Sequence, residues 1–124
     1  MKKLLIVLAL LVSGSVRAEW VKVSDADNRI LYIDPASIRK DGDLRVVWEV
    51  IDLKRRHKDG QMSHRSKVEY DCKAGLYRFL LTSSHSGPMA DGVTIFSAGV
   101  DPTGWKTIAS DSSRAVALGV VCSN

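Results

Sequence analysis

The 124-residue sequence is poor in the side chains that bind metals or perform catalysis. It has three histidines and two cysteines, and His57, His64 and His85 lack the spacing that a metal site requires. The acidic residues are scattered through predicted turns. Ser83 and Ser84 stand beside His85 without the Gly-x-Ser-x-Gly motif of a nucleophile elbow. We therefore expect solvated histidines, no metal, no cofactor and no enzymatic activity.

Long apolar runs are also absent, except at the N-terminus. Lys2 and Lys3 precede an apolar run from Leu4 to Val12, and compact residues follow up to Ala18. This pattern predicts a secretory signal peptide, residues 1–18, cleaved before Glu19. The alternative, a membrane anchor, would need about 20 apolar residues. No cysteine stands at the cleavage point, so we expect no lipid or other membrane anchor and a single mature domain, residues 19–124.

Excess positive charge is largely lost with this leader. The sequence has 18 basic and 14 acidic residues. Lys2, Lys3 and Arg17 leave with the leader and no acid does, which leaves 15 against 14. A nearly neutral chain gives no reason to expect nucleic acid as a partner.

One basic cluster remains, and we call it the basic tip: Lys54, Arg55, Arg56, His57 and Lys58. It lies in a loop between two predicted strands, and Arg65 and Lys67 follow on the second strand. Such a cluster attracts an anionic glycan, an acidic protein, anionic lipid or nucleic acid. The alternative is an ordinary solvated loop.

The scarcity of cysteine leaves one intramolecular pairing. Cys72 and Cys122 are the only two cysteines, and an exported chain folds where disulfides persist. The two cysteines are 50 positions apart, and closing a loop of that length stabilises the folded state by roughly 4 kcal/mol. We predict the Cys72–Cys122 disulfide, with free or intermolecular thiols as the alternative.

Alternating apolar residues predict a sheet. The expected strands are residues 19–23, 30–33, 44–53, 62–72, 76–83 and 93–96, separated by turn or loop residues at 25–28, 41–43, 84–88 and 101–104. Asp34-Pro35 should start a helical turn over residues 36–38. The strand 44–53 has apolar residues on both faces, which predicts that both of its faces are at least partly covered. It forms a long antiparallel hairpin with 62–72.

The C-terminal segment changes period. Asp111 or Ser112 can cap a helix over residues 114–122, in which Ala115, Leu118, Val121 and Cys122 share one side. The fold class is therefore α+β, an antiparallel sheet with one C-terminal helix held to a face by the disulfide. We expect Trp20, Trp48 and Trp105 to pack in the core rather than form a ligand platform.

These landmarks together resemble a known family. They are Trp20, Tyr32-Ile33-Asp34-Pro35-Ala36-Ser37-Ile38, Trp48, Ser66 before Tyr70-Asp71-Cys72, Trp105 and Cys122. The mature chain resembles the surface-adhesin protein E family of Gram-negative bacteria. The resemblance implies about six antiparallel strands, a disulfide-linked C-terminal helix, a tendency to form a homodimer, and binding of host extracellular matrix proteins.

Two function classes follow. The first is an exported, non-catalytic binding protein that engages a host extracellular protein or an anionic glycan through Lys54, Arg55, Arg56, Lys58, Arg65 and Lys67. The second is a periplasmic structural or envelope-assembly factor that pairs through an exposed sheet edge. Either function places the mature protein in the periplasm or outside the cell.

Overall fold

The computed structural model describes residues 19–99 and 104–123. The predicted signal peptide and most of the predicted turn at 101–104 lie outside this range. The elements, in chain order, are β1 (Val21–Asp25), β2 (Arg29–Ile33), η1 (Pro35–Ser37), β3 (Arg39–Asp41), β4 (Leu44–Leu53), β5 (Ser63–Asp71), β6 (Leu76–His85), η2 (Pro88–Ala90), β7 (Thr94–Gly99), β8 (Lys106–Thr107) and α2 (Ser113–Cys122).

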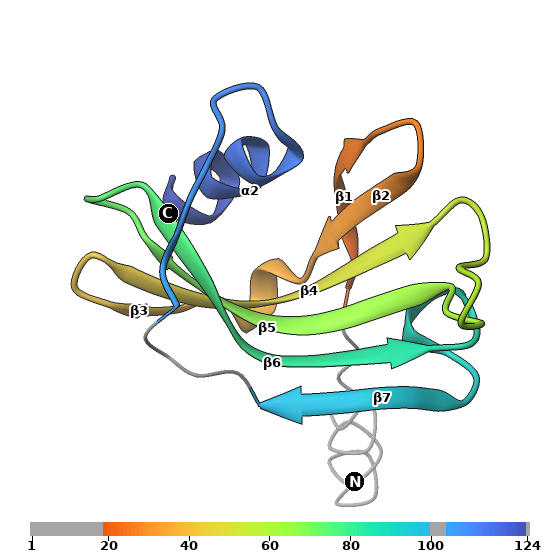
Figure 1. Ribbon diagram of the computed structural model, residues 1–124. Coiled ribbons are helices and arrows are strands. Elements are labelled where there is room, and N and C mark those ends of the chain that lie inside the picture. The colour runs from red at the N-terminus through yellow and green to blue at the C-terminus, as the bar shows by residue number, and fades with distance from the viewer. Residues whose placement is uncertain (1–18, 100–103, 124) are drawn as a thin grey trace, which may run out of the picture.

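One antiparallel sheet organises the chain, with strand order β1-β2-β4-β5-β6-β7 (Figure 1). The long strand β4 pairs with β2 along its second half and with β3 along Leu44–Val46. Strand β6 is shared in the same way, by β7 and by β8. The six-strand path and the C-terminal helix confirm the predicted fold class, and β3 and β8 extend it.

Several predicted boundaries differ from the structure. Strand β1 ends at Asp25, two residues beyond the predicted strand, and β7 begins and ends later than predicted. Strand β6 continues to His85, so the prediction of a loop from Ser84 was wrong. The short strands β3 and β8 were missed because two or three residues carry no measurable alternation.

Both faces of β4 are covered, as its sequence predicts. Val47 and Val50 point to opposite faces and each has 0% of its surface exposed. On the Val50 face lies η2, whose Met89 N–H donates to Asp52 Oδ1 at 2.6 Å. The Ala90 N–H donates to Ser63 Oγ at 2.9 Å. These bonds fasten the η2 turn across β4 and β5.

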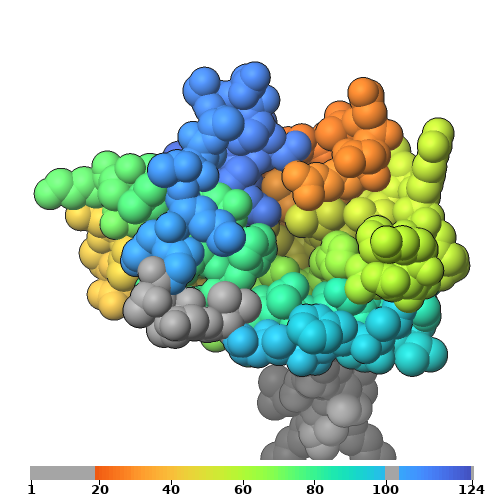
Figure 2. All heavy atoms as spheres, viewed as in Figure 1, coloured from red at the N-terminus to blue at the C-terminus, as the bar shows by residue number. Residues whose placement is uncertain are grey.

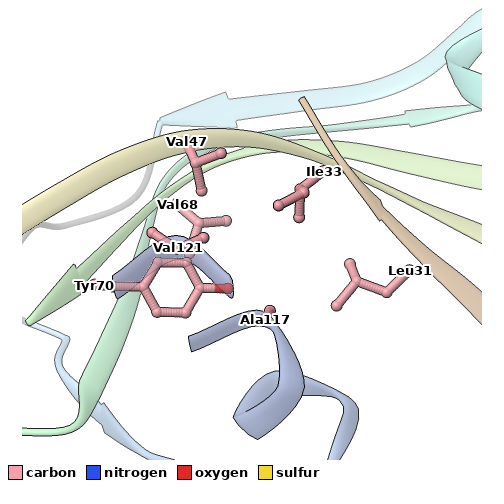
Figure 3. Close-up of a cluster of buried hydrophobic side chains, with 7 residues drawn as sticks. All are labelled: Leu31, Ile33, Val47, Val68, Tyr70, Ala117 and Val121. Carbon is pink, nitrogen blue, oxygen red and sulfur yellow. The ribbon is translucent and has the colours of Figure 1, made fainter. Parts of the chain in front are cut away.

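The main core lies between the other face of the sheet and α2 (Figure 3). It consists of Leu31, Ile33, Val47, Val68, Tyr70, Ala117 and Val121. None of the three tryptophans belongs to it, so their predicted core role was wrong. Trp48 lies beneath the Arg65 guanidinium, 4.0 Å from the ring centroid, and Trp105 lies beneath Arg78 at 4.2 Å.

Helix α2 is capped by Ser112, whose hydroxyl accepts a hydrogen bond from the Ala115 N–H. The buried side is centred on Ala117 and Val121, with Leu118 and Cys122 beside them. The predicted stripe included Ala115 and missed Ala117. Cys72 and Cys122 form the predicted disulfide, with their Cα atoms 5.7 Å apart. No helix in the described part of the chain has the length and apolar character needed to cross a membrane.

Candidate functional site

The basic tip forms the end of the β4–β5 hairpin, beside the β1–β2 turn. It borders an open depression of about 650 Å³ that is lined by Asp27, Asn28, Leu53, Arg55, Arg56, His57 and Lys58. The loop reverses because the His57 N–H bonds to the Gln61 carbonyl and the Gly60 N–H bonds to the His57 carbonyl. Gly60 has a φ of 89°, which favours glycine.

Two of the tip cations are occupied by structural contacts. Lys54 Nζ lies 2.6 Å from Asp25 Oδ1 and so joins the tip to β1. This hydrogen bond lowers the pKa of the Asp25 carboxyl. Arg56 Nη1 donates to the carbonyl oxygens of Gly60 at 2.9 Å and Ser86 at 2.8 Å. Arg56 therefore holds the loop in place.

The remaining tip cations are available to a ligand. Arg55 and Lys58 are exposed, and neither has an ion-pair partner among residues 19–99 and 104–123. His57 is exposed beside Asp59, with Nδ1 3.5 Å from a carboxylate oxygen. Of the predicted binding residues, Arg55 and Lys58 are thus the pair best placed to contact an anion.

Arg65 and Lys67 do not extend the tip. They lie within β5, where they pair with Val50 and Trp48 of β4. Both side chains therefore point to the face opposite α2, because Val68 and Tyr70 point toward the helix. The structure splits the predicted set into the loop residues and two cations on this opposite face.

The histidines are less solvated than predicted. His64 is half-buried, and its Nδ1 lies 2.8 Å from Ser84 Oγ. His85 is only 8% exposed, and its Nε2 lies 2.7 Å from Ser83 Oγ. Only His57 has the predicted exposure. Ser83 and Ser84 of β6 hold the two histidine rings against the sheet. This role was not predicted from the sequence because Ser84 was assigned to a loop.

The Ser83–His85 contact does not complete a catalytic triad. The other ring nitrogen of His85 lies 3.4 Å from the Thr94 hydroxyl, where a triad has a carboxylate. Within the described ranges, no three histidine, cysteine or acidic side chains gather as a metal site would require.

A buried polar cluster was not predicted from the sequence. Glu49 and Arg114 form an ion pair, and the Tyr70 hydroxyl donates to Glu49. Arg114 Nη1 also donates to the Tyr70 oxygen at 2.9 Å. Burial and the nearby Glu49 charge raise the pKa of the Tyr70 hydroxyl. This cluster joins α2 to β4 and β5.

Comparisons with known proteins agree with this architecture. The family model described as surface-adhesin protein E matches residues 20–123. The selenomethionine form of Haemophilus influenzae protein E has a TM-score of 0.65 at 18% identity, covering 89% of this chain and 90% of that chain. Crystal form II of the same protein has a TM-score of 0.64 at 18% identity, covering 88% and 91%. Protein E from non-typeable Haemophilus influenzae has a TM-score of 0.58 at 17% identity, covering 90% and 80%. Among curated protein sequences, none matches the chain.

Proposed function

The chain belongs to the surface-adhesin protein E family, and we propose that it is an exported, non-catalytic binding protein whose basic tip engages an anionic ligand. The mature protein would be residues 19–124, released into the periplasm or beyond after cleavage at Ala18. The ligand would be an anionic glycan or an acidic patch on a host extracellular matrix protein.

The observation that carries this proposal is the pair Arg55 and Lys58. Both are exposed beside the 650 Å³ depression, and neither is neutralised by an ion pair in the described residues. Arg56 fixes the loop by bonding two backbone carbonyls, so the two free cations are presented from a fixed loop. A fixed cationic loop loses little conformational entropy when it binds.

The test is heparin affinity chromatography of the mature protein. We expect retention at low salt and elution as salt rises, because the screening length falls from about 10 Å at 0.1 M to about 3 Å at 1 M. The variant Arg55→Ser/Lys58→Ser should elute at clearly lower salt. Its thermal midpoint should hardly change, since exposed substitutions shift stability by less than about 0.5 kcal/mol.

A matched control removes the same charge elsewhere. Lys40 and Lys73 are exposed at the opposite end of the sheet, where Leu44 pairs with Asp71. Lys40→Ser/Lys73→Ser should elute like the wild type. Equal losses in the two double variants would reject the tip in favour of net charge, and absence of retention at low salt would reject polyanion binding.

A second candidate function is a structural or assembly role in the periplasm, and the observation that favours it is the β7 edge. Ile95 and Phe96 of β7 are 40% and 53% exposed, Val93 just before the strand is 70% exposed, and β7 ends the strand path. An apolar edge of this kind can pair with another chain.

Cell fractionation separates the two candidates. Surface labelling or release into the medium supports the binding function, whereas retention inside an intact outer membrane supports the assembly role.

The mature N-terminus should be Glu19 without a lipid, which the mass of the intact protein measures directly. A diacylglyceryl adduct would contradict both proposed functions.

A further inference from the structure

A groove separate from the basic tip crosses the face of the sheet that carries α2. Its first part has a volume of about 350 Å³. The floor is formed by Leu31, Ile51, Tyr77 and Phe79, and the wall by residues 107–109 and 112–114. In Figure 2 it opens between the blue segment that leads into α2 and the orange β1–β2 hairpin.

The groove continues along β5 and β6. A second hollow of about 260 Å³ is lined by Ile51, His64, Ser66, Phe79 and Thr82. It adjoins the first part because Ile51 and Phe79 line both hollows. Together they give an apolar path across the middle strands of the sheet.

An exposed aromatic side chain lies beyond the second hollow. Thr82 pairs with Ala98 of β7, and Ser84 pairs with Phe96. Antiparallel partners share a face, so Phe96 lies on the groove side of the sheet. It is 53% exposed and extends the apolar path to the sheet edge.

The entrance to the groove is cationic. Arg29 is exposed there and has no ion pair within the described part of the chain. Arg114 contacts Glu49 and Tyr70 through Nη1. Its guanidinium lies over the Tyr77 and Phe79 rings, 4.8 Å and 5.5 Å from the ring centroids, and within residues 19–99 and 104–123 its side-chain hydrogen bonds all use Nη1. No carboxylate lines either hollow.

We propose that this groove binds a single-chain alkyl carboxylate, such as a fatty acid. The carboxylate meets Arg29 and the Nε–Nη2 edge of Arg114, since guanidinium groups bind carboxylates through two parallel hydrogen bonds. The alkyl chain lies over Ile51 and Phe79 toward Phe96. The second hollow has the mostly apolar lining typical of small-molecule sites, whereas the first has several polar side chains, among them Arg29 and Arg114, that can orient the head.

The site is independent of the polyanion function, because the groove and the depression at the basic tip share no lining residue. An alkyl ligand without a charged head would form no ion pair with Arg29 or Arg114. A short carboxylate would make no contact with the apolar residues of the second hollow. The ligand therefore needs both a carboxylate and a long alkyl chain.

Isothermal titration calorimetry of the mature protein tests the proposal with three probes below their micelle-forming concentrations. Dodecanoate should bind with a stoichiometry of one, whereas butyrate and dodecyltrimethylammonium should bind far more weakly. The variant Arg29→Glu should weaken dodecanoate binding by about tenfold or more, a change of about 1.4 kcal/mol. Arg55→Glu, the same charge reversal at the basic tip, should leave the affinity unchanged.

Amide and methyl chemical shifts give a second measurement. Dodecanoate should shift the signals of Ile51, Phe79 and Phe96, and butyrate should not shift Phe96. Equal binding of dodecyltrimethylammonium, equal losses in the two arginine variants, or shifts confined to the basic tip would each overturn the proposal. So would the absence of dodecanoate binding.

Discussion

Glu49 and Arg114 place opposite charges inside the core, where an unpaired charge is costly. Glu49 is 1% exposed and Tyr70 is fully buried. The pair exists because β4 and the start of α2 meet over β5, although the two residues are 65 positions apart. Removing one partner leaves the other buried without compensation.

We expect Arg114→Leu to lower the free energy of unfolding by about 3–5 kcal/mol, measured by urea denaturation. Tyr70→Phe should cost about 1–3 kcal/mol, because one hydrogen-bond donor to Glu49 is lost. The double variant Glu49→Leu/Arg114→Leu should cost less than Arg114→Leu alone, since it leaves no unpaired charge. A loss of stability in the double variant equal to the sum of the losses in Glu49→Leu and Arg114→Leu would contradict a coupled ion pair.

This cluster shows where sequence analysis of single residues stops. Glu49 lies on the same face of β4 as Val47 and Ile51, as the two-residue period of a strand requires. The partner could not be predicted, because no local pattern relates a strand residue to one in a helix far along the chain. The prediction that the tryptophans pack in the core was wrong for a related reason. Their size favours burial in the core, but Trp48 and Trp105 lie at the surface, where the guanidinium groups of Arg65 and Arg78 cover their rings.

His64 gives the protein a pH-dependent stability. Burial, together with the nearby His57, His85 and Arg29, lowers the pKa of its imidazole below the ordinary 6.5. As pH falls through that ordinary value, the unfolded chain takes up the proton before the folded protein does. The folded state is therefore favoured at higher pH and loses stability on acidification.

The melting temperature should decrease as the pH is lowered from about 8 to about 5, the range in which histidine titrates. His64→Gln should show a smaller fall, because glutamine can still bond to Ser84 but does not titrate. A matched variant at the exposed residue His57, His57→Gln, should change the profile less. An unchanged profile in His64→Gln would contradict this assignment.

At the scale of elements, α2 depends on its attachment to the sheet. It has only ten residues and contains Gly119 and several β-branched residues, so it would be marginal as an isolated helix. The Ser112 cap, the Arg114 ion pair and the Cys72–Cys122 bond fasten it at both ends. The disulfide closes a sequence separation of 50 residues.

Cys72→Ser should lower the free energy of unfolding by about 2–5 kcal/mol, and Cys122→Ser should lower it equally. The double variant should cost no more than either single variant, because all three remove the same bridge. Denaturation of the periplasmically expressed proteins, with thiol alkylation as a check, measures these losses. Two alkylatable thiols in the wild type, or additive losses, would contradict the bond.

The elements that could be predicted are those with a sustained period. Strands β4 and β5 and helix α2 each have nine or ten residues, and their residue patterns identified them. The basic tip followed from the same hairpin. Arg65 and Lys67 did not join it, because the strand turns their side chains to the face opposite α2. Which cations are free to bind depends on contacts with Asp25 and Ser86, which come from other parts of the chain.

For the whole molecule, the two edges of the sheet differ. Strand β1 carries Lys22 and Asp25, and charges of this kind discourage pairing with another sheet. Strand β7 has no charged residue and no proline. It presents Ile95 and Phe96 at the surface. A second copy of the chain can therefore extend the sheet along β7 more readily than along β1.

We expect the mature protein to self-associate through β7 as a homodimer, with a dimer fraction that rises with concentration in sedimentation velocity. Ile95→Lys/Phe96→Ser should shift it to monomer, because the apolar cross-strand contacts that these two side chains can make on the two faces of the extended sheet are lost. The control Val116→Ser/Val120→Ser changes two exposed residues of α2 and should leave the dimer intact. Loss of the dimer in the control alone would move the interface to the helix.

Dimer formation would also change how the basic tip works. A dimer carries two tips, and two linked sites bind one long polyanion up to about 10²–10⁴-fold more tightly than a single site when both can engage. Ile95→Lys/Phe96→Ser should therefore elute from heparin at lower salt than the wild type, although Arg55 and Lys58 are intact and a lysine has been added. Elution at higher salt, as the added charge alone would produce, would show that the tips act singly.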